Sequence, residues 1–148
     1  MTASITLYQS FREYLVDGTF DLNSNTFKVT LHTSTYTPSA STHTVYADLT
    51  NELSTANGYT NGGATLGTVT LNRSGGTVTF DAADTTWTAS GGSIVARYAV
   101  IRASGTLNTR VDPLVAYILL DTTPADVTAT TGNPLTLTWN ASGILTIT

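Results

Sequence analysis

The sequence places three oxygen-bearing side chains, Asp21, Asn23 and Asn25, at the spacing of the first ligands of a calcium loop. The pattern then departs from such a loop, because Thr26 stands where the sharp turn needs glycine and His32 stands where a bidentate glutamate is required. We therefore interpret this segment as a turn in which Asp and Asn side chains bond to the nearby backbone. The pattern predicts no metal or cofactor here.

Two further pairs of side chains have the right types for chemistry. His32 and His43 could bind zinc, but no third ligand stands at a recognisable spacing from them. Asp81 and Asp84 lie three residues apart, as in a general acid and base pair, but in a turn that offers nothing to shift their pKa values. The sequence therefore predicts no catalytic, cofactor-binding or metal-binding residues.

A glycine-rich stretch, 57–63, resembles a phosphate-binding loop in composition only. A phosphate loop is followed by a helix and usually ends in Gly-Lys-Ser/Thr, whereas 65–71 here has the alternation of a strand. Just before this stretch, Asp48 could cap a short helical turn near residues 49–54, because Leu49 and Leu53 share a face at that spacing. We expect a structural loop after a short helical turn.

Composition limits the kinds of protein this chain can be. It has 148 residues, of which 41% are hydrophobic and only 11% charged, against roughly 25% charged in ordinary soluble domains. Abundant Thr, with Val, Ile, Tyr and Trp, favours strands, because branched and aromatic side chains suit a pleated surface. The length is that of a single domain, 1–148, with room for a substantial core.

The net charge of −4 and a single lysine leave no basic surface for nucleic acid or an anionic membrane. The chain has no cysteine, so disulfides and thiolate metal sites are excluded. The sequence shows no targeting signal and no long apolar run. We expect a protein that is made in the cytoplasm and used there or assembled into something larger.

The N-terminal region predicts one helix, from about residue 7 to residue 16. Thr6 and Gln9 have the spacing of a capping box, and Gly18 is suited to follow the helix end. An apolar stripe of Tyr8, Phe11 and Leu15 would let this helix pack as a lid on a sheet or plug a neighbouring subunit, and we expect Phe11 and Leu15 to be buried.

The rest of the chain predicts antiparallel strands. Residues 27–31 alternate as a half-buried strand, and 69–71 with 78–80 flank a glycine turn as a hairpin. The apolar runs 94–101 and 114–120 indicate central strands, covered on both faces. Residues 135–139 and 144–147 predict a second hairpin, with Trp139 in the core.

These elements predict a mainly β fold, an antiparallel β-sandwich with the N-terminal helix on it. The Ser- and Thr-rich segment 33–44 is too polar for a core element and long for a connection. It is either a flexible surface loop or an arm that contacts a partner.

Nearly the whole chain resembles a small family of tailed-bacteriophage structural proteins. The resemblance rests on Phe11, Leu15 and Gly18, on Asp21-Leu22 and 26–31, on Thr50-Asn51-Glu52-Leu53 and 58–63, on Thr86-Trp87-Thr88 and 96–101, and on 114–118 and 139–144. It implies a virion component, most plausibly a head decoration or cement protein with a jelly-roll-like β-sandwich. Its motifs are structural, so it supplies no catalytic residues.

We therefore expect a non-enzymatic virion structural protein that binds and stabilises the capsid surface. Its expected partners are the major capsid protein or other virion proteins, and it should form a homo-oligomer, because few charges oppose self-association. It would be synthesised in the host bacterial cytoplasm. The candidate contact residues are Tyr8, Phe11, Leu15, Tyr36, Tyr46, Tyr59 and Trp87.

Two other classes of function stay open at this stage. A tail-fibre or carbohydrate-binding receptor module would line a site with Trp87, Tyr36, Tyr46 and Tyr59, provided that these rings are exposed. A hydrolase of cell-wall polymer would need two of Asp81, Asp84 and Glu52 to face each other across a cleft.

Overall fold

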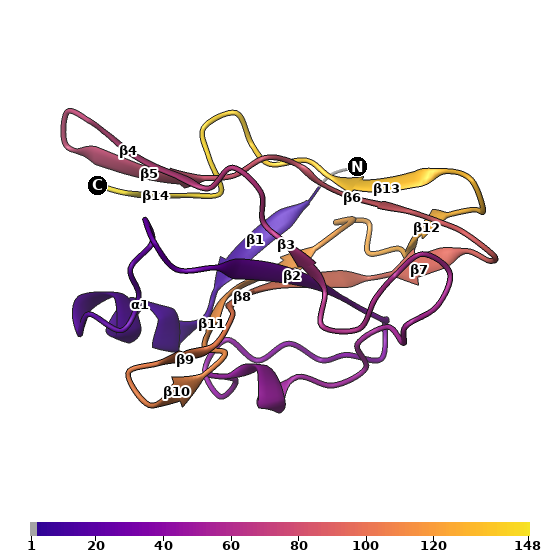
Figure 1. Ribbon diagram of the computed structural model, residues 1–148, viewed down its shortest axis with the longest axis horizontal. Helices are drawn as coiled ribbons and strands as arrows, with labels where there is room; N and C mark the ends of the chain where they lie inside the picture. The colour runs from indigo at the N-terminus through magenta and orange to yellow at the C-terminus, as the bar shows by residue number, and fades with distance from the viewer. Residues whose placement is uncertain (1–2) are drawn as a thin grey trace.

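A computed structural model describes residues 3–148 and shows a mainly β protein. It has several antiparallel sheets, one N-terminal helix and one 3-10 turn (Figure 1). The helix is α1 (Gln9–Val16) and the 3-10 turn is η1 (Tyr46–Asp48). The strands are β1 (Ser4–Leu7), β2 (Phe27–His32), β3 (Ala64–Thr65), β4 (Thr70–Ser74), β5 (Thr77–Asp81), β6 (Thr85–Thr88), β7 (Ile94–Ala96), β8 (Tyr98–Ala103), β9 (Thr106–Leu107), β10 (Arg110–Val111), β11 (Leu114–Leu119), β12 (Val127–Ala129), β13 (Pro134–Leu137) and β14 (Leu145–Ile147).

A five-stranded antiparallel sheet in the order β1-β11-β8-β2-β3 forms the middle of the molecule. Strands β8 and β11 are central in it, which confirms the prediction from their apolar sequences. The predicted strand 94–101 divides at Arg97, where the chain bends and the side chain pairs with Asp126 at 2.8 Å. Its first part, β7, then pairs with β12 outside the central sheet.

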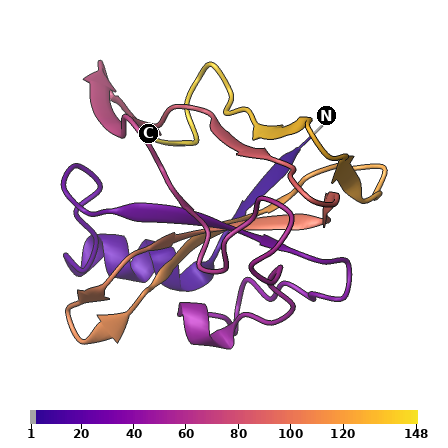
Figure 2. The ribbon, with the colours of Figure 1, turned by 45° about the vertical axis from the view of Figure 1, so that its right-hand side comes forward.

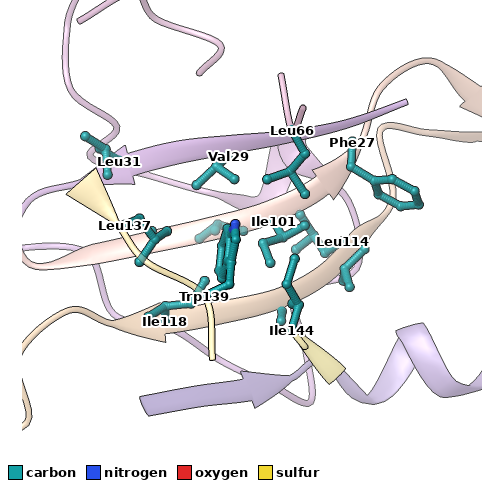
Figure 3. Close-up of a cluster of buried hydrophobic side chains, with 14 of the residues drawn as sticks. Phe27, Val29, Leu31, Leu66, Ile101, Leu114, Ile118, Leu137, Trp139 and Ile144 are labelled. Carbon is teal, nitrogen blue, oxygen red and sulfur yellow. The ribbon is translucent and has the colours of Figure 1, made fainter. Parts of the chain in front are cut away.

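A second layer covers one face of the central sheet. It consists of the three-stranded sheet β14-β5-β4 and the β13-β6 pair (Figure 2). Side chains from both layers meet in the core, where Leu137, Trp139 and Ile144 lie against strands of the central sheet (Figure 3). The Phe27 and Phe80 rings join the layers with their centroids 5.2 Å apart. This core contains Trp139, as its alternating sequence predicted.

Helix α1 lies on the other side of the central sheet (Figure 1). Phe11 is buried against Phe20, with ring centroids 5.2 Å apart, whereas Leu15 is only half-buried and Tyr14 is buried instead. The helix was predicted at 7–16 but begins at Gln9, and no side chain caps it. The predicted capping box is wrong because Thr6 belongs to β1, where it pairs with Tyr117.

The predicted helical turn at 49–54 is wrong. The turn lies earlier, at Tyr46–Asp48, and the Asp48 carboxylate accepts the backbone N–H groups of Thr44 and Val45 at 2.7 and 3.1 Å. Leu49 itself has an extended backbone, and Leu53 N–H donates to Leu31 O at 2.9 Å. Pairing along β2 therefore replaces the local helical hydrogen bonds.

The predicted β4-β5 hairpin is confirmed, with its turn at Gly75-Gly76. The predicted C-terminal hairpin is wrong, since β13 pairs with β6 and β14 pairs with β5. Between them, Trp139 is held at the core by bonds from its backbone N–H to Asp84 (3.0 Å) and from its indole N–H to Ala83 O (3.1 Å). The chain thus crosses from one pair of strands to the other.

We predict that Gly63→Ala destabilises the fold far more than Gly18→Ala. Both glycines have positive φ, +79° and +81°, so both substitutions should cost about 1–2 kcal/mol of backbone strain. A Cβ at Gly63 would also overlap the carbonyl oxygen of Val29, whereas one at Gly18 meets nothing within 4 Å. Urea denaturation should therefore show an additional loss on the order of 2 kcal/mol for Gly63→Ala; equal losses would contradict this account.

Candidate functional site

The calcium-like segment is a hydrogen-bonded turn, as the sequence predicted. Asp21 accepts the backbone N–H of Asn23 at 3.0 Å and the hydroxyl of Ser24 at 2.5 Å. The Ser24 bond, followed by the Asn23 bond, holds the pKa of Asp21 below its usual value. Within residues 3–148 no group of three or more His, Cys, Asp or Glu side chains is arranged to hold a metal ion.

The main polar cluster is built around Arg102 of β8 and Glu52 of the adjacent loop. The Arg102 guanidinium is only 5% exposed; it bonds to Asp112 at 3.0 Å and to Gly62 O at 3.1 Å. Its Cζ also lies 4.1 Å from the centre of the Tyr46 ring, close enough for a cation–π contact. Three loops are thereby tied to one strand of the central sheet.

The carboxylate of Glu52 accepts hydrogen bonds within the same cluster. It accepts the hydroxyls of Tyr46 and Tyr59, the latter at 2.6 Å, and the N–H of Gly62 at 2.6 Å. Burial, and then the bond to Glu52, raise the pKa of Tyr46 to about 12, and the same causes raise the pKa of Tyr59. The carboxylate of Glu52 thus accepts hydrogen bonds from groups of its own chain.

A second cluster connects the two histidines through Tyr36. The ring centroids of His32 and Tyr36 are 4.7 Å apart, and the Tyr36 hydroxyl bonds to Tyr8 at 2.9 Å and to His43 Nδ1 at 3.1 Å. Buried Tyr36 therefore anchors the polar segment 33–44 beneath the central sheet. This explains how a segment of such composition is held without regular secondary structure.

His32 is fully buried and bonded on both ring nitrogens. Nδ1 lies 2.8 Å from Thr50 O, so Nδ1 carries the proton and donates it, and Nε2 accepts from the Thr30 hydroxyl at 2.9 Å. Burial lowers the pKa of His32, although the Thr50 carbonyl and the Glu52 charge act in the opposite direction. The buried ring is therefore neutral near pH 7.

The seven candidate contact residues lie mostly inside the fold. Five of them are at most 5% exposed, namely Tyr8, Phe11, Tyr36, Tyr59 and Trp87, whereas Leu15 and Tyr46 are half-buried. In this conformation the buried five pack on the chain's own residues, so their contact with a partner stays a prediction. The four aromatic rings proposed for a sugar site do not form an exposed stacking surface here.

A different surface has the character of a contact site. In the β4-β5-β14 sheet, Leu71, Phe80 and Leu145 lie opposite one another and form a row across the three strands. A second row across the same strands consists of Arg73, Val78 and Ile147. Alternation places both rows on one face, and burial of Phe80 shows that this is the face turned to the core. Leu71 and Ile147 are nonetheless 38% and 41% exposed.

These residues are exposed because the β4-β5 hairpin projects beyond the rest of the molecule (Figure 1). We name the exposed part of the apolar face, Leu71, Arg73, Val78 and Ile147, the overhang. Near the tip, its opposite face carries hydroxyls and one amide, from Asn72, Ser74, Thr77, Thr79 and Thr146, and farther from the tip it carries Thr70 and the carboxylate of Asp81. Sequence alternation marked these strands but could not show that the core ends before the hairpin does.

Comparison with family models, with curated proteins and with solved structures finds no match for this chain. Across residues 3–148, no helix has the length and apolarity to cross a membrane. The structural arguments about function therefore rest on the clusters and surfaces described above.

We predict that Glu52→Ala destabilises the protein by about 2–4 kcal/mol, since it removes the acceptor of two hydroxyls and one backbone N–H. Glu13→Ala, on the exposed side of α1, should change the free energy of unfolding by less than about 0.5 kcal/mol. Chemical denaturation of both variants tests the difference. A small effect of Glu52→Ala would mean that water replaces the carboxylate.

Stability should decrease as the pH falls below the ordinary pKa of histidine, 6.5. Because burial lowers the pKa of folded His32, the unfolded chain binds a proton in a pH range where the folded chain does not. The loss is about 1.4 kcal/mol for each pH unit between the two pKa values. Denaturation of the wild type between pH 7 and pH 5 should show this slope.

His32→Gln should reduce the slope between pH 7 and pH 5, because it removes the buried titrating group. His43→Gln keeps His32 and should retain the slope. An unchanged slope in His32→Gln would assign the pH dependence to other groups.

Proposed function

We propose that this protein is a non-enzymatic structural component of a tailed-phage virion, which decorates the head by binding its protein lattice. The observation that carries the proposal is the overhang, an apolar surface with one charged residue at the end of a projecting hairpin. Isolated exposed apolar residues are ordinary, but several side by side on one sheet face are typical of an interaction site.

The end-to-end resemblance of the sequence to phage structural proteins supplies the class of partner. The major capsid protein, or another virion protein, is the proposed partner of the overhang, and assembly as a homo-oligomer on the particle is part of the proposal. The virion surface is the proposed location.

The arrangement of layers supports the jelly-roll-like β-sandwich that the resemblance implies. One face of the central sheet is covered by β14-β5-β4 and β13-β6 (Figure 2). The crossing of the chain between those two groups of strands also supports it, because connections between non-neighbouring strands characterise such folds.

The internal use of the polar groups supports binding rather than catalysis. The Glu52 oxygens accept bonds from Tyr46, Tyr59 and Gly62, and the Asp84 carboxylate accepts the backbone N–H of Trp139. Carboxylates used in this way stabilise loops.

We expect the contact with the lattice to be apolar and therefore resistant to salt. The screening length shrinks from about 10 Å at 0.1 M salt to about 3 Å at 1 M, which weakens ionic interfaces and leaves apolar ones in place. Sedimentation of capsids of the encoding phage with bound protein, across this salt range, measures retention. Release by 1 M NaCl would contradict an apolar contact.

Leu71→Lys should weaken binding to such capsids by at least about tenfold, or 1.4 kcal/mol, because it places a charge in the centre of the contact. Val95→Lys is the matched control, since Val95 on β7 is 42% exposed but lies outside the overhang. Equal binding of the two variants would exclude the overhang as the contact surface.

A further inference from the structure

The two edges of the central sheet differ in how they are protected against further pairing. The β3 edge is only two residues long, and Gly62 and Gly63 precede it with positive φ, so a regular partner strand cannot extend along it. The β1 edge is a straight strand of four residues with an unbroken register to β11. It carries no charge, proline or bulge, which are the usual protections of an edge strand.

The open side of β1 presents unused backbone groups. Tyr8 N–H donates to Val115 O at 3.1 Å, and along an antiparallel strand the groups alternate in direction. The N–H and C=O groups of Ile5 and Leu7 therefore point away from β11. No strand within residues 3–148 lies on that side, since β1 is the terminal strand of its sheet.

A hollow lies on each face of this edge. On the core side, a hollow of about 690 Å³, here named the core-side hollow, lies between the two layers. It is lined by apolar residues, Ile5, Ile118, Trp139 and Ile144 among them, and by the polar residues Thr138, Asn140, Ser142 and Thr146. Figure 3 shows Trp139 and Ile144 at this place, beside Ile118. The side chains of a strand added to β1 would enter it at every second position.

On the opposite face, Ser4 and Thr6 border a hollow of about 410 Å³, here named the tyrosine hollow, with Tyr98, Tyr117 and Pro38. None of the described residues that line either hollow is charged. The edge therefore suits an uncharged strand with apolar side chains on one face and small polar ones on the other.

We infer that the β1 edge binds the β1 strand of a second copy of this chain, antiparallel to it, so that two central sheets join into one. The strand Ser4-Ile5-Thr6-Leu7 has the pattern that the edge requires. A two-fold axis perpendicular to the sheet keeps each face continuous. The second isoleucine then lies at the mouth of the core-side hollow, and the second serine and threonine lie by the tyrosine hollow.

The expected dimer is weak on its own. Four paired residues bury less surface than the roughly 1,200–2,000 Å² of a stable interface. Two copies held on one assembly would be at a high effective concentration, which strengthens a weak contact without new interactions. The inference does not depend on the proposed capsid role, because β1 and the overhang are separate surfaces.

The test is analytical ultracentrifugation of the full chain from about 10 µM to about 1 mM, a range that covers weak association. Ile5→Lys and Val95→Lys form a matched pair, since Ile5 and Val95 are 36% and 42% exposed on strands of different sheets. Lysine at position 5 keeps its charge in water along the edge and opposes pairing with an identical strand. We expect dimers in the wild type and in Val95→Lys, and at least a tenfold weaker dimer in Ile5→Lys.

Amide hydrogen exchange of the wild type gives a second measurement that needs no variant. Protection of the Ile5 and Leu7 amides should rise with protein concentration. A monomer at all concentrations, or a dimer that Ile5→Lys leaves intact, would overturn the inference.

Discussion

The guanidinium of Arg102 is the charge on which the loop side of this molecule depends. A charge that is 5% exposed must be compensated, or its desolvation would outweigh the surrounding packing. Asp112, Gly62 O and the Tyr46 ring provide that compensation. Tyr46 and Gly62 belong to the long segment between β2 and β3, and Asp112 belongs to the turn between β10 and β11. Both connections are therefore positioned by one side chain of the central strand β8.

Glu52 extends this arrangement outward from the sheet. Its bonds to Tyr46, Tyr59 and Gly62 fix the glycine-rich stretch to the chain before it, and Tyr59 in turn accepts the backbone N–H of Leu31 on β2 at 3.0 Å. Because Arg102 and Glu52 both bond to Gly62 and both contact Tyr46, the loops are part of the folded unit. This is a structural use of residue types that elsewhere serve catalysis.

The core between the two layers is not covered everywhere. The core between the layers is closed around Phe27 and Phe80 but opens toward β1, where the core-side hollow lies, and it ends before the tip of the β4-β5 hairpin. Apolar side chains continue past both points, at Ile5 and at Leu71 and Ile147. A chain with so few charges leaves these surfaces neutral, which favours contact with other protein surfaces over repulsion from them.

The sequence by itself determined the mainly β, antiparallel character of the fold, the two central strands, the β4-β5 hairpin and the helix near the N-terminus. These follow from periodicity and turn residues, which act over a few neighbouring positions. Even here the boundary at Thr6 was decided by pairing with Tyr117, because a sheet bond replaced the helix cap that the local sequence offered.

Only the tertiary structure decided which strands pair and which aromatic residues are covered. The 135–147 region has the local pattern of a hairpin, yet β6 and β5 bind its two strands separately, and the burial of Trp139 outweighs the turn. The burial or exposure of the candidate site residues was likewise decided by the tertiary structure. Tyr36, Tyr59 and Trp87 could not be assigned to the interior, nor Leu71 and Ile147 to the surface, because burial depends on residues that are distant in the chain.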